Sequence, residues 1–122
     1  MKFILLICLF SVVFSMRVFT EKDHESMNIL QKDEIFRIEL STNPSTGYTW
    51  KMRELDEDHF KLLDHGINQP ARIQPGTSFK EFWEIQAVDA GYTFIYLFYN
   101  QDFNVGINHD FMIAFRIIEQ KN

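Results

Sequence analysis

The sequence predicts an all-β protein in which two antiparallel sheets pack into a sandwich. Aromatic residues make up 16% of the chain and Phe alone occurs 13 times; such bulky side chains favour pleated, half-buried surfaces. Apolar and polar residues alternate in several short segments, which is the period of a strand. No segment of adequate length repeats apolar residues at the spacing of an amphipathic helix.

Seven segments carry strand signals. An edge strand is expected over residues 27–30, and alternation over residues 35–40 places Phe36, Ile38 and Leu40 on one face. The other predicted strands cover residues 48–52, 60–63, 79–88, 92–99 and 111–118. The segment 92–99 is almost wholly aromatic and β-branched, which predicts a central strand.

Turn signals separate these strands. Residues 42–47, 68–77 and 100–109 are loops by composition, and the acidic residues 55–59 could hold a single helical turn. A tight turn is expected at Asp89-Ala90-Gly91, because Gly91 can adopt a positive φ without steric cost. Short strands at fairly even spacing with turns between them indicate an immunoglobulin-like antiparallel β-sandwich.

The N-terminal residues are predicted to be a secretory signal peptide, residues 1–15, that precedes a single domain of residues 16–122. Lys2 provides a short positive region, residues 3–14 are apolar apart from Ser11, and Val13 and Ser15 suit the −3 and −1 positions of a cleavage site. The apolar run is shorter than the ~20 residues that span a bilayer, so no membrane anchor is expected. The expected location is the secretory pathway, with the protein secreted or held in lysosome-like vesicles.

Removal of this segment changes the chemistry of the chain. The only cysteine, Cys8, leaves with it, so the mature protein is expected to form no disulfide and to use no thiol nucleophile. Loss of Lys2 leaves 11 basic residues against 17 acidic ones, a formal net charge of −6. Nucleic acids and anionic membranes attract basic surfaces, so neither is an expected partner. A monomer is expected.

The sequence offers little support for an enzyme, a metal site or a cofactor. Ser45 lies in no Gly-x-Ser-x-Gly motif. Asp58 precedes His59 and Asp64 precedes His65, but adjacent residues on a strand point to opposite faces and are not preformed metal ligands. We interpret these histidines, His24, His109 and the carboxylates of residues 56–58 as solvated surface groups.

The segment Asn43-Pro44-Ser45-Thr46-Gly47-Tyr48 is the candidate binding site. Pro44 fixes its own φ and favours an extended Asn43, Ser45 and Thr46 can bond to nearby backbone groups, and Gly47 allows the chain to turn back. A stiff loop that presents two small hydroxyl groups is predicted. From these residues alone, an ordinary well-made turn remains an alternative.

With Thr49 and Trp50 added, this segment resembles the signature of the chagasin family of cysteine-peptidase inhibitors, Asn-Pro-Thr-Thr-Gly, an aromatic residue and, two residues later, Trp. Ser45 stands where the family more often has Thr. The resemblance extends in order over most of residues 16–122. It implies an immunoglobulin-like sandwich that reversibly inhibits papain-like, cathepsin-like cysteine peptidases, with three loops at one end filling the active-site cleft and Thr46 near the nucleophilic cysteine.

The other two loops match the family less well. The second is glycine-rich in the family, whereas only Gly76 and Thr77, after Pro75, are available here. In the third, Gln101 and Asp102 replace an Arg-Pro pair, and Phe103 retains the aromatic residue that follows. The resemblance thus implies that Gly76, Thr77, Gln101, Asp102 and Phe103 bind the peptidase beside residues 43–48.

Two other classes of function remain open at this stage. A secreted immunoglobulin-like binding or adhesion module with a different ligand would have the same fold, and fold alone does not separate it from an inhibitor. An enzyme is disfavoured, because no nucleophile, base and orienting group form a convincing set.

Overall fold

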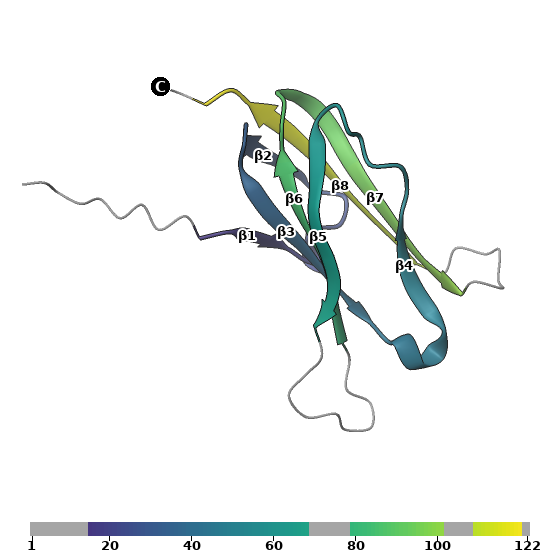
Figure 1. Ribbon diagram of the computed structural model, residues 1–122. Helices are drawn as coiled ribbons and strands as arrows, with labels where there is room; N and C mark the ends of the chain where they lie inside the picture. Colours follow the sequence, from purple (N-terminus) through teal and green to yellow (C-terminus); the bar gives the residue numbers. More distant parts are fainter. Residues whose placement is uncertain (1–14, 69–78, 102–108, 121–122) are drawn as a thin grey trace, which may run out of the picture.

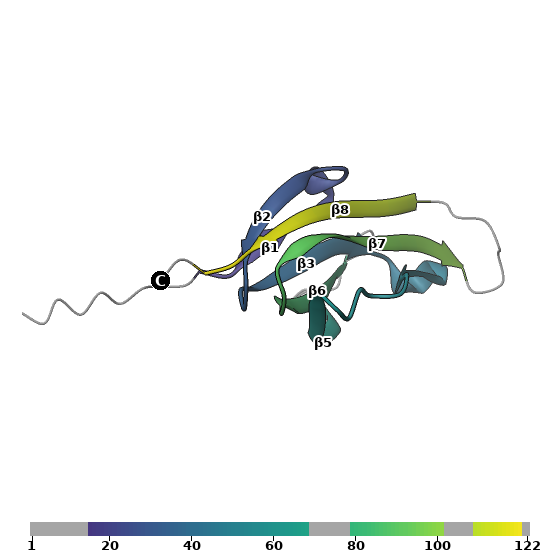
Figure 2. The same ribbon diagram turned by 90° about the horizontal axis from the view of Figure 1, so that it is seen from above.

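Two four-stranded sheets face each other in the computed structural model, which describes residues 15–68, 79–101 and 109–120 (Figures 1 and 2). The first sheet has the strand order β1-β3-β6-β5 and the second has the order β2-β8-β7-β4. The predicted all-β sandwich is confirmed. The proposed signal peptide, apart from Ser15, lies outside the described residues.

Seven of the strands that the structure describes, β2 to β8, agree with the predicted segments in order and place, whereas β1 was not predicted. The first sheet contains β1 (Arg17–Phe19), β3 (Ile35–Thr42), β5 (Phe60–Asn68) and β6 (Phe79–Ala87). The second contains β2 (Met27–Gln31), β4 (Tyr48–Met52), β7 (Gly91–Gln101) and β8 (His109–Ile118). Two short 3-10 helices, η1 (Glu21–Asp23) and η2 (Pro44–Thr46), lie in connections between the sheets.

Two strand pairs at the sheet edges are parallel, which the sequence did not reveal. β1 runs parallel to β3, and β2 runs parallel to β8, whereas the other four pairs are antiparallel. The chain changes sheets between β1 and β2 and again between β2 and β3, so consecutive strands here do not pair with each other. Pairing direction at these edges is therefore set by the crossings, and local sequence carries no signal for it.

The core is built from the faces that alternation predicted to be buried. Four phenylalanines of β1, β3, β5 and β8 meet at ring-centroid distances of 5.0 to 5.9 Å, mostly edge to face, and they are Phe19, Phe36, Phe60 and Phe115. Each fully buried side chain of this size contributes about 1.5–3 kcal/mol by leaving water. The cluster thus ties the two sheets together.

The turn at Gly91 has the predicted positive φ, at 143°. There is also no room for a side chain at this position, because a Cβ atom on Gly91 would lie 2.7 Å from Nε2 of His59. His59 belongs to the connection between β4 and β5, where the backbone N–H groups of His59 and Phe60 donate to the carbonyl of Asp56. The segment is a single hydrogen-bonded turn, whose bond from Phe60 to Asp56 has the spacing of one helical turn, and β5 continues beyond the predicted residues 60–63.

Candidate functional site

The 43–48 loop carries the chain from β3 of the first sheet to β4 of the second at one end of the sandwich (Figure 1). Asn43 is extended, with φ −134° and ψ 88°, as expected before a proline. η2 then turns the chain, and Gly47 reverses it in the left-handed region, with φ 80° and ψ 0°. Proline and glycine thus take the two conformational roles that the sequence predicted for them.

Both hydroxyl groups bond within the loop. The Ser45 hydroxyl donates to Oδ1 of Asn43 at 2.6 Å, and the Thr46 hydroxyl donates to the carbonyl of Asn43 at 2.7 Å. Oγ1 of Thr46 also accepts a longer bond of 3.3 Å from the N–H of Tyr48. All residues from Asn43 to Gly47 are exposed. The loop is therefore braced from inside while its outer surface stays open to a partner.

Tyr99 of β7 supports the loop from below. Its ring stacks on Tyr48 at a centroid distance of 5.2 Å and lies 5.0 Å from the ring of Trp50. The Tyr99 hydroxyl accepts a bond of 3.1 Å from the N–H of Asn43, and Nε1 of Trp50 donates to the carbonyl of Ser41 at 2.9 Å. Trp50 packs against the core and Tyr48 is half-buried, so both side chains anchor the loop to the sandwich.

A groove of about 410 Å³ opens beside the loop, with Asn43, Trp50, Tyr99 and His109 among its lining residues. Glu21 also lines it and accepts a hydrogen bond from the N–H of Ser41. Burial tends to raise the pKa of Glu21, but the bonds from Ser41 and the nearby charge of Lys80 outweigh burial and leave the pKa below its ordinary value. Glu21 therefore stays ionised at the base of the loop.

Sequence reasoning missed Tyr99 and Glu21 as parts of this end. Tyr99 was one of many aromatic residues in a predicted central strand, and only the pairing of Trp50 with Tyr99 across β4 and β7 shows that it lies under the loop. Glu21 is 20 residues from Ser41 in the chain. No local signal marks a contact at that separation.

The strand ends that bear the other two predicted loops lie at this same end. Thr42 pairs with Phe79, the first residue of β6. Tyr48 pairs with Gln101, the last residue of β7. The predicted binding residues Gly76, Thr77, Asp102 and Phe103 lie outside the described residues, and for Gln101 only the backbone is described. Their proposed contacts with a peptidase stay predictions.

Two of the histidines interpreted as solvated surface groups pair with carboxylates; His65 is exposed, as predicted, and His59 is half-buried. Nε2 of His65 lies 2.7 Å from Oε2 of Glu81, which is buried, and the His65 ring stacks on Trp83. Nδ1 of His59 lies 2.7 Å from Oδ2 of Asp56. The first contact joins β5 to β6, and the second lies within the turn between β4 and β5. Among the described residues, no three His, Cys, Asp or Glu side chains form a group that could hold a metal ion.

Comparison with known families supplies the deciding observation. The family model for the chagasin family peptidase inhibitor I42 matches residues 29–114, which contain the 43–48 loop, β3 to β7 in full and parts of β2 and β8. The chain belongs to the chagasin family. As a member of a family of peptidase inhibitors it is an inhibitor and not an enzyme, which confirms the class of function that the 43–48 signature predicted.

Individual relatives agree with this family. Amoebiasin-2 of Entamoeba histolytica is 34% identical over 107 residues, which are 85% of this chain and 85% of that protein. The crystal structure of the cysteine protease inhibitor EhICP2, from the same organism, matches with a TM-score of 0.71 at 25% identity and covers 84% of this chain and 94% of that one.

The solution structure of Amebosin matches with a TM-score of 0.66 at 22% identity, covering 84% of this chain and 98% of that one, and supports the fold. In the described part of this chagasin-family chain, no helix is long and apolar enough to cross a membrane.

Proposed function

We propose that this protein reversibly inhibits papain-like cysteine peptidases, and that the 43–48 loop enters the active-site cleft. The observation that carries the proposal is the loop itself: it is exposed, braced by its own hydroxyl groups and seated on Tyr99. Membership of a peptidase-inhibitor family and the similarity to the cysteine protease inhibitor EhICP2 support the choice of target class.

Rigidity favours this loop as an inhibitory element. A loop whose backbone is already held by Pro44, η2 and the hydrogen bonds of Thr46 loses little conformational entropy when it binds. More of the contact energy then appears as affinity. The small side chains of Ser45, Thr46 and Gly47 let the backbone approach the floor of a narrow cleft. We place Thr46 nearest to the catalytic cysteine of the peptidase.

The shape of the loop also explains why the inhibitor should remain uncut. A 3-10 turn over Pro44–Thr46 followed by left-handed Gly47 is a tightly bent backbone. A bent segment need not present a peptide bond in line with the attacking thiolate. The inhibitor therefore blocks access by its shape, without supplying a catalytic group, and dissociates intact.

Loops on either side complete the interface. The β5–β6 connection contributes Gly76 and Thr77, and the end of β7 with its connection to β8 contributes Gln101, Asp102 and Phe103. The strands that bear these two connections end beside the 43–48 loop. Together the three loops would approach the roughly 800 Å² per partner of a standard interface. Phe103→Ala should weaken inhibition less than a change in the central loop, because only one flank is lost.

Entry into the secretory pathway belongs to the same proposal. Residues 1–15 have the pattern of a signal peptide, and the first strand begins at Arg17, directly after the proposed cleavage site. The mature protein is then either secreted or held in lysosome-like vesicles. N-terminal sequencing of the exported protein should begin at Met16, and its Tm should not respond to a reducing agent. A mature chain that begins at Met1 would contradict this part of the proposal.

Inhibition kinetics test the main proposal. Residues 16–122 are titrated against papain and a cathepsin L-type peptidase, with trypsin as a serine-peptidase control. We expect inhibition of the two cysteine peptidases, recovery of activity on dilution, and an inhibitor of unchanged mass afterwards. Failure to inhibit any papain-like enzyme, or progressive cleavage of the 43–48 loop, would refute the proposal.

A further inference from the structure

The outer face of the second sheet has an unusual composition. In β7 the inward residues Ile95 and Leu97 are buried in the core. The alternate, outward positions are all aromatic, and they are Tyr92, Phe94, Tyr96 and Phe98. An antiparallel sheet with one solvated face normally places polar residues on that face. Here both faces of the strand are apolar, so its outer face is a candidate binding surface.

The neighbouring strands extend this aromatic face. Met112 of β8 pairs with Tyr96, and Met27 and Ile29 of β2 pair with outward positions of β8. Large parts of these side chains are open to solvent: Tyr92 is 69% exposed, Phe94 59% and Met27 60%. Soluble monomers seldom expose a contiguous apolar surface that spans three strands.

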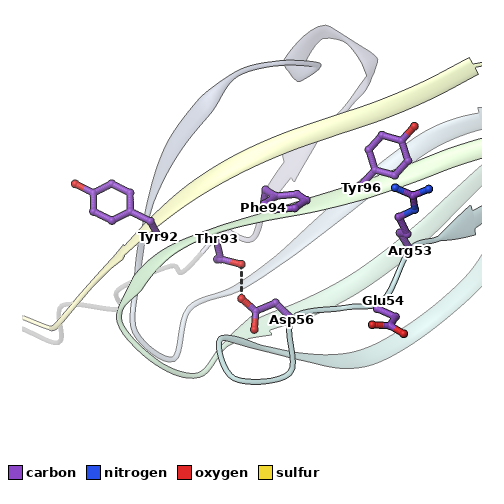
Figure 3. A pocket seen from close by; sticks show the side chains of 7 residues that line it. All are labelled: Arg53, Glu54, Asp56, Tyr92, Thr93, Phe94 and Tyr96. Carbon is purple, nitrogen blue, oxygen red and sulfur yellow. Dashed lines mark hydrogen bonds between the residues drawn. The ribbon is translucent and has the colours of Figure 1, made fainter.

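Charged groups border the aromatic face. Figure 3 shows Tyr92, Phe94 and Tyr96 along β7, with Arg53 beside Tyr96 and Glu54 next to it. These residues line a shallow hollow of about 490 Å³. The Arg53 guanidinium lies 5.4 Å from the centre of the Tyr96 ring, and that of Arg116 lies 5.8 Å from the Tyr92 ring. Arg53 thus lies at the edge of the aromatic face, whereas Arg116 lies between Ile29 and Tyr92, so charged groups both border and interrupt the apolar surface.

The outer face of the first sheet provides an internal contrast. There Arg37 lies 3.5 Å from Glu39 and 3.5 Å from Glu84, and its guanidinium covers the ring of Phe82 at 4.3 Å. That face is a solvated, charge-laced surface of the ordinary kind. The aromatic face is therefore a local feature of the second sheet and not a general property of this Phe-rich chain.

The register between β7 and β8 makes the aromatic face self-complementary. The inward-facing pair Ile95–Ile113 marks the middle of this register. Outward-facing pairs of β7 and β8 residues lie at equal distances on either side of it. One position away are Phe94 with Ala114 and Tyr96 with Met112; three positions away are Tyr92 with Arg116 and Phe98 with Asp110. Consider a two-fold axis between two facing copies, perpendicular to the strands and level with the Ile95–Ile113 pair. It would place apolar groups of one copy opposite apolar groups of the other, and the Arg116 guanidinium of one copy opposite the Asp110 carboxylate of the other.

We propose that two copies of this chain associate face to face through the aromatic face, with their β7 strands antiparallel, so that Tyr92 of each copy meets Phe98 of the other and Arg116 meets Asp110. The sequence alone leads to the expectation of a monomer, and the surface chemistry leads to a dimer. Two-fold symmetric dimers are the commonest oligomers, and their interfaces must be self-complementary in this way.

The geometry allows these contacts. Residues three positions from the axis lie about 10 Å from it, at about 3.4 Å per residue. Facing sheets cross at about 30°, which displaces a strand from its counterpart by about 5 Å at that distance, close to the spacing between neighbouring strands. A flexible arginine side chain spans such an offset, so the Arg116–Asp110 contact survives the crossing angle.

The dimer would leave inhibition intact. The aromatic face lies along the side of the sandwich, whereas the 43–48 loop lies at one end (Figures 1 and 2). Because the two β7 strands run antiparallel, the two 43–48 loops point in opposite directions. Each could occupy its own peptidase. Self-association and inhibition are therefore separable properties, and failure of one says nothing about the other.

Sedimentation equilibrium of residues 16–122 over a concentration series tests the proposal. We expect a monomer–dimer equilibrium, and Phe94→Ser should raise the dissociation constant roughly tenfold or more, as for a central interface aromatic. Phe82→Ser, on the outer face of the first sheet, is the matched control and should leave the equilibrium unchanged.

A charge swap tests the orientation. Arg116→Asp and Asp110→Arg should each weaken the dimer several-fold, and the double variant should restore it, because the two charges meet only across the two-fold axis. A protein that is monomeric throughout the series overturns the proposal, whether or not this face binds phosphatidylcholine vesicles. A double variant no stronger than the single ones overturns the antiparallel arrangement, while papain inhibition by Phe94→Ser, Phe82→Ser and Arg116→Asp should equal that of the parent.

Discussion

The two ends of the sandwich each contain a glycine with positive φ, and the two sites are built differently. Gly47, in the 43–48 loop, has φ 80°, and a Cβ atom there would have no neighbour within 4 Å. Gly91, at the opposite end, has φ 143°, and the same atom would meet His59 at 2.7 Å. The first glycine shapes a loop that protrudes, and the second makes room for a side chain packed against it.

The side-chain bonds follow the same division. At the Gly91 end, Oδ2 of Asp56 accepts a bond of 2.7 Å from Nδ1 of His59 within the same turn. It also accepts a bond of 2.8 Å from the Thr93 hydroxyl, which joins this turn to β7 (Figure 3). In the 43–48 loop, both hydroxyl bonds stay inside the loop. The bonds of Asp56 therefore stabilise the packing of the fold, whereas the two hydroxyl bonds of Ser45 and Thr46 stabilise the shape of the loop. Substitutions should separate stability from inhibition accordingly.

The largest effect on stability is expected from Gly91→Val. The branched side chain would meet His59 and would also require a β-branched residue at a positive φ. We expect a loss of about 2–4 kcal/mol in the free energy of unfolding, as for overpacking combined with backbone strain. Urea denaturation measures it. The fraction that remains folded should inhibit papain like the parent.

A double variant separates the two causes of that loss. Gly91→Ala combined with His59→Ala removes the clash but keeps the unfavourable φ. It should therefore lose less stability than the sum of the two single variants. Strict additivity would show that the contact between Gly91 and His59 does not constrain the turn.

A smaller loss of stability is expected from Gly47→Ala. Open space surrounds this residue, so only the left-handed backbone conformation opposes a side chain, at a cost of about 1–2 kcal/mol. Inhibition should weaken more than stability does, because the loop must bend differently to relieve the strain. Measuring the inhibition constant and the denaturation midpoint together tests this. A weakened fold with unchanged inhibition would contradict the assigned role of the loop.

The smallest effect concerns pH and the Gly91 end. The hydrogen bond from Thr93, together with the bond and charge of His59, lowers the pKa of Asp56 against the opposing effect of burial. A lowered pKa in the folded state stabilises the protein above the pKa of an unfolded aspartate, about 3.9, and this contribution is lost as the pH falls below that value. The Tm of the parent should thus drop more steeply in acid than that of Asp56→Asn. Parallel Tm curves from pH 7 to pH 3 would contradict this assignment.

Much of the fold could be predicted because the alternation of apolar and polar residues in a strand is visible within a few consecutive residues. Alternation placed Phe36, Ile38 and Leu40 on a buried face, and all three are buried in the core. The 43–48 loop was also predictable, because proline and glycine restrict the backbone without help from distant residues. The loop's residues and conformation therefore emerged together from one short segment.

Features that depend on distant residues were not predictable. The composition of residues 92–99 correctly predicts a central strand, because β7 lies between β8 and β4, but it does not show that Ile95 and Leu97 are buried while Tyr92 and Phe94 are exposed. The pairing of His65 with the buried Glu81 spans 16 residues. Alternation gives the two faces of a strand, but only the arrangement of the sheets decides which face another layer covers.

The most direct test of the central claim is the inhibition constant of Thr46→Arg against papain. An arginine at the tip of the loop cannot enter a narrow cleft without steric and desolvation costs, so we expect inhibition to weaken at least about a hundredfold, or about 2.7 kcal/mol. The Tm should fall only slightly, because Thr46 is exposed and the hydroxyl bonds that the substitution removes lie within the loop.

Glu57→Arg is the matched control. Glu57 is exposed in the turn at the opposite end of the sandwich, and its replacement by arginine changes the net charge by more than Thr46→Arg does. Comparing the two variants therefore distinguishes an effect of the substituted position from an effect of the net charge. We predict that Glu57→Arg inhibits papain as strongly as the parent while Thr46→Arg does not. Equal inhibition by Thr46→Arg and the parent would contradict the claim that the 43–48 loop occupies the cleft.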